Sequence, residues 1–393
     1  MDTDDIIILA NNLQNLRCAM KALERYCDEW QIYVNCSKTK IVVFGGGVPR
    51  RNTTYELFGE EIENVDCYKY LGITFHRNGN LKKAQDEMIK HASKAMYALV
   101  SKGRRLQIPT DLMIELFHSL IIPIVTYGSE VWGFSMTRDL EKLQLKFLKM
   151  ILNVKPSTCN SIVYGETGVY PVYIYVNKNM IGYWCRILMG KASKLCNIMY
   201  QCMLKLYHEN VYKWPWLVYI RKLLDDCGQS FVWDTQTNIN AKWLKLAMER
   251  RMKDQWIQKW QGDIEQKSSC YLYRMYKCTY GMETYLKLST ESRLYITKFR
   301  TSNSKIPVVL GRYNNIPREN RKCHLCQSDD VGDEYHLLLK CDNVLLQEYR
   351  ELYFPLYYIN NPSIHKFCKI LNNMNELQLE KLAMFLKKAF VLL

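Results

Sequence analysis

The first thirty residues combine a β-type hydrophobic run with a helical one. Residues 6–10 are apolar and mostly β-branched, which predicts a strand at the start of the chain. From residue 13 to residue 30, apolar side chains recur every three or four positions, the spacing of one buried helix face. Asn11 or Asn12 precedes this run and can cap the helix. The sequence therefore predicts a strand followed closely by an amphipathic helix.

β-type patterns return after this helix and continue to about residue 80. Residues 32–35, 41–44 and 67–75 are short runs enriched in β-branched and aromatic residues, and each is predicted to contain strand. The Asn78-Gly79 pair follows the last run, and this dipeptide is typical of tight turns. The mixture of helix and strand patterns predicts an α/β region over residues 1–80.

From residue 81 the pattern changes to helical periodicity. A first amphipathic helix is predicted to bury one face, formed by Met88, Ala92, Ala95 and Leu99. Other helices are predicted to begin at Pro109-Thr110 and to cover residues 138–152 and 375–393. The longest apolar stripe has four-residue steps and consists of Leu244, Met248, Met252, Trp256 and Trp260. Residues 301–321 are rich in turn-forming and basic residues, so we expect mostly loop there.

Together these patterns predict an α+β protein that is predominantly α-helical. With 393 residues the chain is long enough for two or three domains and a large core. No repeat or low-complexity tract interrupts it. We expect five segments, at residues 1–80, 81–155, 156–300, 301–345 and 346–393.

The charge balance favours an anionic partner. The chain has 54 lysines and arginines against 39 aspartates and glutamates, a formal net charge of +15, which favours nucleic acid. Glu115, Pro123 and Glu130 interrupt the most apolar stretch, so no transmembrane helix is predicted. Acidic residues at the N-terminus stand where a secretion signal has basic ones. We therefore expect an intracellular protein, nuclear or cytoplasmic, that is neither secreted nor membrane-spanning.

Two clusters interleave basic residues with apolar or aromatic ones. The first consists of Lys102, Arg104 and Arg105, and the second of Arg250, Arg251, Lys253, Trp256 and Lys259. Both are compatible with contact to a phosphate backbone. For the second cluster the favoured alternative is a helix whose Trp and Met residues form a core face and whose charges form the solvated face.

One group of residues has the spacing of a metal site. Cys323 and Cys326 form a CxxC pair, and His336 and Cys341 follow within the next fifteen residues. Three thiols and one imidazole can close a tetrahedral shell around Zn²⁺ and leave no open position, so the predicted role is structural. The alternative is coincidence in a chain with 15 cysteines, most of which we interpret as reduced core thiols.

Asp4 and Asp5 stand directly before the predicted first strand. Burying adjacent carboxylates is costly unless a cation or hydrogen bonds compensate them. Carboxylate oxygens are the usual protein ligands of Mg²⁺ in enzymes that transfer phosphoryl or nucleotidyl groups. The pair is therefore a candidate catalytic metal site. A solvated turn is the alternative, and the dipeptide by itself favours that alternative.

Several motifs, in their order and spacing, resemble the last palm motifs of reverse transcriptases from non-LTR (LINE-like) retrotransposons. They are the Asp-Asp pair with its apolar run, residues 34–44, and the Tyr-Lys-Tyr-Leu-Gly-Ile segment at residues 68–73. Residues 121–133 and 311–317 are similar to regions beyond the palm in that family. The resemblance implies a truncated palm (1–80), a helical thumb (81–155), a helical connector (156–300), a basic loop with a zinc knuckle (301–345) and a helical tail (346–393).

The resemblance also implies roles for individual residues. Asp4 and Asp5 fall on the family's Asp-Asp motif and would be the catalytic Mg²⁺ ligands. Contacts to nucleic acid or nucleotide would come from Lys38, Lys40, Tyr68, Tyr70 and Gly72. From the residues alone, Lys38 is equally compatible with a solvated turn, and residues 68–73 with a half-buried strand.

By this resemblance the chain is a fragment of an RNA-directed DNA polymerase. Its partners would be an RNA template and a DNA primer or cDNA, with Mg²⁺ as catalytic cofactor and Zn²⁺ as structural one. Asp2 and Thr3 replace the aromatic and small residues usual before the Asp pair, and the family's other catalytic carboxylate and its fingers lie upstream of that pair. We therefore expect no activity from this chain alone. The alternative is a non-enzymatic nucleic-acid-binding protein with a structural zinc knuckle.

Overall fold

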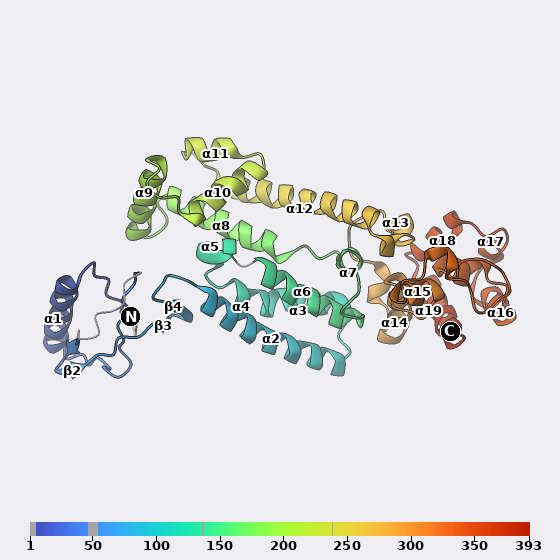
Figure 1. Cartoon of the computed structure of the whole chain (residues 1–393), viewed down its shortest axis with the longest axis horizontal. Coiled ribbons are helices and arrows are strands. Elements are labelled where there is room, and N and C mark those ends of the chain that lie inside the picture. Colours follow the sequence, from blue (N-terminus) through green and yellow to red (C-terminus); the bar gives the residue numbers. More distant parts are fainter. Residues whose placement is uncertain (1–4, 46–53, 136, 238) are drawn as a thin grey trace. The chain divides into compact units, whose positions relative to one another are not determined.

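The computed structural model describes residues 5–45, 54–135, 137–237 and 239–393. The chain divides into two compact units, Met1–His91 and Ala92–Leu393. Figure 1 labels most of the helices and strands of both. Helices make up most of the regular structure, and the strands are few and short. The prediction of a mainly helical α+β protein is confirmed at this level.

The first unit contains one long helix and two small β-hairpins. Its elements are α1 (Leu13–Trp30), β1 (Glu56–Leu57), β2 (Glu60–Glu61), β3 (Cys67–Tyr70), β4 (Ile73–His76) and the beginning of α2 (Lys82–Arg105). The helix α1 has the predicted bounds. Asn12 caps it, because its side-chain oxygen accepts a hydrogen bond from the Asn15 backbone N–H at 2.8 Å.

A small core holds the first unit together. Its buried members are Met20 of α1, Tyr55, Leu57 and Ile62. Half-buried apolar side chains from α1 and from the loop after it pack against this core. Trp30 at the end of α1 is 63% exposed, so the predicted buried face is confirmed only for the middle of the helix.

The strands predicted in the first forty-five residues are wrong. Residues 5–10 and 32–35 have no regular secondary structure, and within residues 41–44 only Ile41 forms an isolated bridge, with Asn64. Apolar residues 6, 7 and 9 are all more than half exposed. A β-branched run forms a strand only where a neighbouring strand satisfies its backbone hydrogen bonds. In the part of the chain that the structure describes, no strand lies beside these segments.

The strand predicted at residues 67–75 is an antiparallel hairpin of β3 and β4. Leu71 and Gly72 form its turn, with φ angles of 45° and 82°. These left-handed values match those of a two-residue hairpin turn, and only glycine adopts them without steric cost. Asn78 and Gly79 also form a turn, directly after β4, as predicted.

The second unit is built from helices. In chain order its α-helices after α2 are α3 (Thr110–Leu120), α4 (Ile122–Thr126), α5 (Ser129–Trp132), α6 (Thr137–Leu152), α7 (Asn160–Thr167), α8 (Val172–Leu188), α9 (Lys194–His208), α10 (Pro215–Asp226), α11 (Ser230–Thr235), α12 (Ala241–Gln266), α13 (Tyr273–Tyr276), α14 (Thr290–Arg300), α15 (Pro307–Tyr313), α16 (Val344–Tyr353), α17 (Leu356–Ile359), α18 (Ile364–Leu371) and α19 (Glu376–Val391). Short 3₁₀ turns are η1 (Gly133–Ser135), η2 (Ser268–Cys270), η3 (Thr284–Lys287) and η4 (Arg318–Asn320), and η5 (His336–Lys340) is a π-helical turn. The helices predicted at residues 110, 138–152 and 375–393 are confirmed to within two residues.

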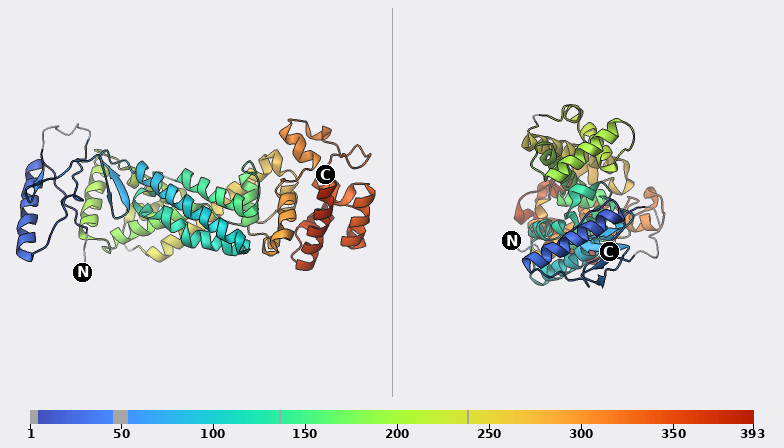
Figure 2. Two further views of the ribbon diagram at one scale, coloured as in Figure 1. Left: turned by 90° about the horizontal axis from the view of Figure 1, so that it is seen from below. Right: turned by 90° about the vertical axis from the view of Figure 1, so that its left-hand side faces the viewer.

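The predicted apolar stripe of α12 is buried along its whole length. Its members are Leu244, Met248, Met252, Trp256 and Trp260, and Ile264 extends it by one more turn. The helix α12 packs against α8 and α7, and Figures 1 and 2 show it running beside α8. The four-residue spacing of large side chains therefore predicted the central packing of the second unit.

The buried face of α2 differs from the prediction by one residue in its second half. After Ala92, the buried side chains are Met96 and Val100, whereas the predicted Ala95 and Leu99 are only half-buried. Steps of three and of four residues both stay near one helix face. Periodicity therefore does not decide whether Ala95 or Met96, and Leu99 or Val100, is the buried residue. Packing against the rest of the unit decides between them.

A completely buried ion pair joins α7 to α14. The Nε and Nη2 atoms of Arg300 donate to the two carboxylate oxygens of Glu166 at 2.7 and 2.9 Å, and neither side chain has exposed surface. A carboxylate oxygen of Glu283 lies 2.9 Å from the same guanidinium, and the Tyr285 hydroxyl donates to Glu166 at 2.6 Å. This network ties together segments that lie 134 positions apart in the sequence.

Residues 301–321, predicted to be mostly loop, contain α15 and η4 instead. Pro307 occupies the first turn of α15, where its missing N–H leaves no hydrogen bond unmade. Gly311 lies within that helix, and a Cβ there would come within 2.5 Å of the Arg321 side chain. The proline therefore begins a helix, and the glycine allows a helix to pack closely. Neither residue marks a loop here, which is why the prediction from composition was wrong.

No single helix in the described ranges is both long and apolar enough to cross a membrane. Two consecutive segments, Thr110–Thr126 and Ser129–Ser135, reach the required length and composition only when taken together, and they are bent by 62°.

Candidate metal centre

A short hairpin positions the first two cysteines. An isolated bridge joins Lys322 to Val331, and the Cys323 backbone N–H donates to the Asp330 carbonyl at 3.1 Å. Gly332 allows the close approach, because a Cβ there would lie only 3.0 Å from the Cys323 Cα. The chain between the two sides of this hairpin carries Cys326. The CxxC segment is thus the tip of a hairpin, where both thiols can face the same point.

The turn η5 positions the histidine and the third cysteine. The Asp333 carboxylate accepts a hydrogen bond from the His336 backbone N–H at 2.9 Å, and the Cys341 N–H donates to the His336 carbonyl at 2.8 Å. Arg350 of α16 braces the end of this turn by donating to the carbonyls of Leu338 at 3.1 Å and Cys341 at 2.5 Å. His336 and Cys341 therefore have a fixed backbone.

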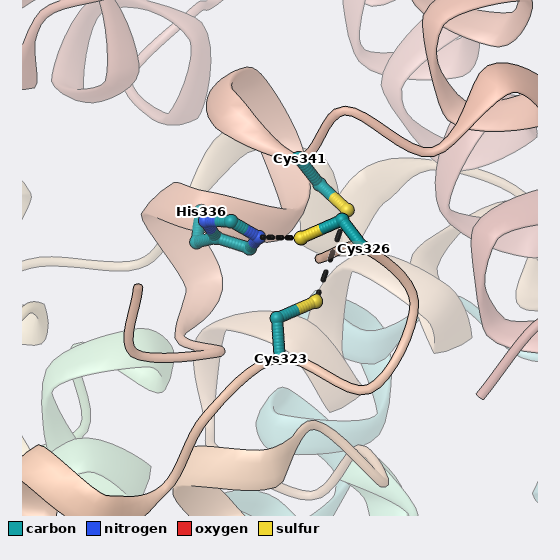
Figure 3. Close-up of side chains that lie close together, drawn as sticks. All are labelled: Cys323, Cys326, His336 and Cys341. Atoms are coloured by element: carbon teal, nitrogen blue, oxygen red, sulfur yellow. Dashed lines mark hydrogen bonds between the residues drawn. The ribbon is translucent and has the colours of Figure 1, made fainter. Parts of the chain in front are cut away.

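The predicted ligands Cys323, Cys326, His336 and Cys341 converge on one point. Their ligand atoms all lie within 4.8 Å of one another, and Figure 3 shows them directed toward each other. The Cys323 and Cys341 Sγ atoms are 3.8 Å apart, and the Cys326 Sγ lies 3.3 Å from the His336 Nε2. Zinc–sulfur bonds of about 2.3 Å in a tetrahedron place two sulfurs about 3.8 Å apart. The donor set and its spacing fit a tetrahedral metal ion.

Electrostatics within the group favour a mixture of thiol and thiolate. Burial opposes ionisation of Cys326, but hydrogen bonds from Ser328, Cys323 and His336 outweigh it and lower the pKa of this thiol to about 6. Burial raises the pKa of Cys341 to about 12. A divalent cation bound by all four residues would hold the three sulfurs as thiolates, since metal binding displaces their protons.

The residues assigned to polymerase chemistry lie in the first unit. Asp4 lies outside the described residues, and Asp5 is exposed in a segment without strand structure. Among the residues that the structure describes, the Cys/His group is the one cluster of three or more potential metal ligands. Asp5 therefore has no described cluster of ligands around it, and the described residues alone do not form a Mg²⁺ site.

Lys38 and Tyr68 lie close together in the first unit, and their proposed roles at nucleotide and primer stay predictions. Lys38 is exposed in a turn that begins at Asn35, and its backbone carbonyl accepts a hydrogen bond from the Tyr68 hydroxyl at 3.2 Å. Lys40 forms an ion pair with Glu63 at 2.9 Å. The turn favoured by the residues alone is thus present, and the Lys38 side chain is accessible to solvent.

Tyr70 and Gly72 belong to the β3–β4 hairpin. Tyr70 is half-buried at the end of β3, and Gly72 is exposed in the turn. The exposed turn leaves backbone groups accessible to a ligand. The role of this hairpin at the primer strand stays a prediction.

The two basic clusters have different surroundings. Lys102, Arg104 and Arg105 are all exposed in the last turn of α2, and Arg104 donates to the Met150 carbonyl at 3.1 Å. In the second cluster Trp256 is buried and Lys253 pairs with Glu249 at 2.8 Å. This packing agrees with the alternative favoured for the second cluster, in which the Trp and Met residues form a core face and the charges form the solvated face.

The buried Glu166–Arg300 pair was missed by sequence reasoning. Glu166 lies between Gly165 and Thr167 in α7, a helix that is buried almost throughout, and a single charged residue in an otherwise uncharged segment was the available signal. Its partner could not be chosen, because the chain has 54 basic residues and the pair lies 134 positions apart.

A cavity of about 410 Å³ lies beside this region and was also not predicted. It is lined by α3, α8 and α12 and contains both acidic and basic side chains, including Glu115, His118, Lys178 and Glu249. Burial lowers the pKa of His118. Glu249 pairs with two lysines there, Lys178 at 2.5 Å and Lys253 at 2.8 Å.

Proteins of mobile elements match part of the chain. An uncharacterized transposon-derived protein of Caenorhabditis elegans is 28% identical over 144 residues, which are 34% of this chain and 47% of that protein. The RNA-directed DNA polymerase from the mobile element jockey of Drosophila melanogaster is 24% identical over 143 residues, which are 34% of this chain and 15% of the polymerase. No family model and no solved structure matches the chain. The chain spans less than half the length of either relative, and the matches support a retrotransposon-related origin.

Proposed function

We propose that this chain is the C-terminal part of the reverse transcriptase of a non-LTR retrotransposon, in which it contacts the template and primer. The match to the jockey polymerase carries this proposal. The net charge of +15 supports a nucleic-acid partner, because a basic chain releases counterions from a phosphate backbone. The order of motifs, from the Asp-Asp pair to the Cys/His group, agrees with that family.

In the complete polymerase, Asp4 and Asp5 are proposed to supply Mg²⁺ ligands. Lys38, Lys40, Tyr68, Tyr70 and Gly72 are proposed to contact the nucleotide or the primer strand. Two-metal nucleotidyl transfer needs carboxylates from more than one strand to hold its ions. Asp5, without a described cluster of carboxylates around it, cannot meet this requirement by itself.

Primer extension tests the catalytic part of this proposal. We expect no incorporation of deoxynucleotides by the purified chain with Mg²⁺, an RNA template and a DNA primer. Efficient incorporation that disappears in Asp4→Asn and Asp5→Asn would contradict the expectation and would make the chain a polymerase in its own right.

The Cys/His group is proposed to hold one structural Zn²⁺. Four ligands complete a tetrahedral shell, and a metal without an open position has no site for substrate or activated water. Metal analysis of the purified chain should find one zinc ion per molecule, and none in Cys323→Ala. Cys202→Ala, which changes an exposed cysteine of α9, is the matched control and should keep its zinc. A zinc-free native protein would end this part of the proposal.

Binding to RNA and DNA across a salt series tests the proposed partner. We expect the logarithm of the affinity to fall linearly with the logarithm of salt concentration. Replacing Lys102 and Arg105 together by Ala should weaken binding and reduce the slope by up to about 2, because each lost phosphate contact reduces it by up to about 1. Lys142→Ala is the control, since Lys142 is exposed and already paired with Asp139 at 3.0 Å.

The alternative function is nucleic-acid binding without catalysis. The same charge supports it, and it needs no Mg²⁺ site. The reading frame in the flanking genomic sequence separates the two candidates. A frame that continues upstream into fingers and further palm strands would favour the polymerase, whereas its absence would leave binding as the activity.

A further inference from the structure

Two cysteines that are distant in the sequence meet at the beginning of α7. The Sγ atoms of Cys159 and Cys270 are 3.9 Å apart, although 111 positions separate these residues. Cys159 is the N-cap residue of α7, and Cys270 is the last residue of η2. Both are free thiols. A movement of about 2 Å would bring the sulfurs to disulfide bonding distance.

The surroundings of Cys159 favour its thiolate. The Cys270 Sγ lies within hydrogen-bonding distance of the Cys159 Sγ, and two backbone N–H groups in the first turn of α7 also bind the Cys159 sulfur. Lys267 and Lys149 both interact electrostatically with Cys159. The hydrogen bond from Cys270 is the largest effect, and against the opposing effect of burial these contacts lower the pKa of Cys159 to about 5.

The arrangement around the pair is held by an ion pair and hydrogen bonds. The Lys267 ammonium donates to the Ser161 hydroxyl at 2.8 Å, and Asp263 lies 3.5 Å from the same ammonium. Asp263 is thus the acidic group that partly offsets the lysine. Since Ser161 belongs to the first turn of α7, this contact fixes the lysine beside the helix start that carries Cys159.

The two thiols differ in access to solvent. Cys159 is half-buried, whereas Cys270 is completely buried. A small oxidant therefore reaches Cys159 first. An accessible thiolate next to a buried thiol is the arrangement in which oxidation of one sulfur is followed by attack of the other.

We propose that Cys159 and Cys270 form a peroxide-sensitive thiol pair, with Cys159 as the reacting thiolate and Cys270 as the resolving thiol. The Cys159 sulfur attacks one oxygen of hydrogen peroxide, so that an S–O bond forms, the O–O bond breaks, and hydroxide leaves and takes up a proton. The Cys270 sulfur then attacks the sulfenic sulfur, so that the S–S bond forms, the S–O bond breaks, and water leaves with the Cys270 proton. The two thiols lose two electrons in total, and the peroxide gains them.

The first step prepares the second. In the reduced pair, the hydrogen bond to Cys159 raises the pKa of Cys270 strongly, and burial and the charge of Cys159 raise it further. Conversion of Cys159 to a neutral sulfenic acid removes that charge and that acceptor, which makes the Cys270 thiol easier to ionise. Oxidation of Cys159 therefore precedes, and promotes, the attack by the Cys270 sulfur. This inference does not depend on the proposed function.

Stepwise oxidation of the full zinc-loaded chain tests the proposal. After treatment with limiting hydrogen peroxide, alkylation and digestion, we expect the first new species to be a cross-link between the peptides of Cys159 and Cys270. Its mass is lower by two hydrogen atoms, and dithiothreitol reverses it. Because the bridge closes a loop of more than 100 residues, the oxidised chain should melt at a higher temperature than the reduced one.

Variants assign the two roles. Cys270→Ala should accumulate a sulfenic acid at Cys159, which dimedone traps, and Cys159→Ser should leave Cys270 unmodified over the same peroxide range. Cys202→Ser, at an exposed cysteine, is the control and should form the cross-link at the native rate. We expect Cys159 to react about tenfold faster than Cys202. Equal rates at these two cysteines, or a sulfenic acid that persists at Cys159 in the native chain, would overturn the proposal.

Discussion

The second unit contains two polar clusters that differ in how their charge is balanced. At Glu166 and Arg300 the protein supplies both signs of charge, and each nitrogen of the Arg300 guanidinium has a partner within the chain. In the Cys323–Cys341 group, four donor atoms lie within 4.8 Å of one another, and none of the four carries a fixed positive charge. The first cluster is balanced by charges within the chain, whereas the second has the donor set of a cation site. The difference shows that burial alone does not identify a ligand site, and that the balance of charge among the buried groups does.

Removing Arg300 should have the largest effect on this comparison. Arg300→Leu leaves the buried Glu166 carboxylate without the guanidinium that binds both of its oxygens, and it removes a hydrogen bond to the Leu371 carbonyl. We expect the free energy of unfolding in urea to fall by about 3–5 kcal/mol, the cost of breaking a buried pair. A loss below about 1 kcal/mol would mean that the pair is not buried in solution.

Acid should reduce the contribution of Glu166 to the free energy of unfolding, by no more than the loss expected for Arg300→Leu. Burial opposes ionisation of Glu166, but Arg300 and the Tyr285 hydroxyl lower the pKa of this carboxyl in the folded chain. Its stabilisation is therefore complete above the unfolded pKa of about 4.3 and is lost as the pH falls through the lower folded pKa. The difference in unfolding free energy between the native chain and Glu166→Gln should shrink from about pH 7 to about pH 3. A constant difference would contradict the lowered pKa.

Zinc removal should destabilise the other cluster without affecting the first. With free zinc about 100-fold above the dissociation constant, binding adds about 2.7 kcal/mol to the unfolding free energy. A chelator should remove this amount from the native chain and nothing from Cys323→Ala. The Arg300→Leu loss should be the same with and without chelator, because the two clusters share no residue. An equal response of the native chain and Cys323→Ala to chelator would show that the group is not the zinc site.

The smallest effect is expected for a surface ion pair. Lys387 and Glu291 lie 2.6 Å apart, but both side chains are more than half exposed. Lys387→Met should leave the midpoint of urea unfolding close to that of the native chain, because water and salt screen the pair. This variant is also the control for Arg300→Leu, since both remove one basic partner of a glutamate. A loss as large as that of Arg300→Leu would show that burial is not what separates the two pairs.

Much of the helical structure could be predicted from the sequence. The bounds of α1 and the buried stripe of α12 follow from residue spacing, because a helix repeats every 3.6 residues wherever it packs. The strands predicted at residues 6–10, 32–35 and 41–44 are absent for the opposite reason. A strand depends on a partner that spacing within one segment cannot reveal.

The Cys/His group and the Glu166–Arg300 pair also differ in whether local spacing could predict them. The four ligands of the Cys/His group lie within nineteen consecutive residues, and their local spacing predicted that they converge. Glu166 and Arg300 lie 134 positions apart, and so do not share a local pattern. Cys159 and Cys270 likewise belong to separate segments, each of which contains an ordinary buried or half-buried cysteine.

The sequence by itself determined the helical periodicity, the positive charge, the Cys/His ligand set and the resemblance to retrotransposon polymerases. Only the tertiary structure decided which buried charges pair, which of the predicted strands forms, and which two of 15 cysteines come within 3.9 Å outside the Cys/His group. The physical reason is how far apart in the sequence the interacting residues lie. Helix faces and ligand spacings are set by neighbours along the chain, whereas buried ion pairs and sulfur contacts form between segments that only packing brings together.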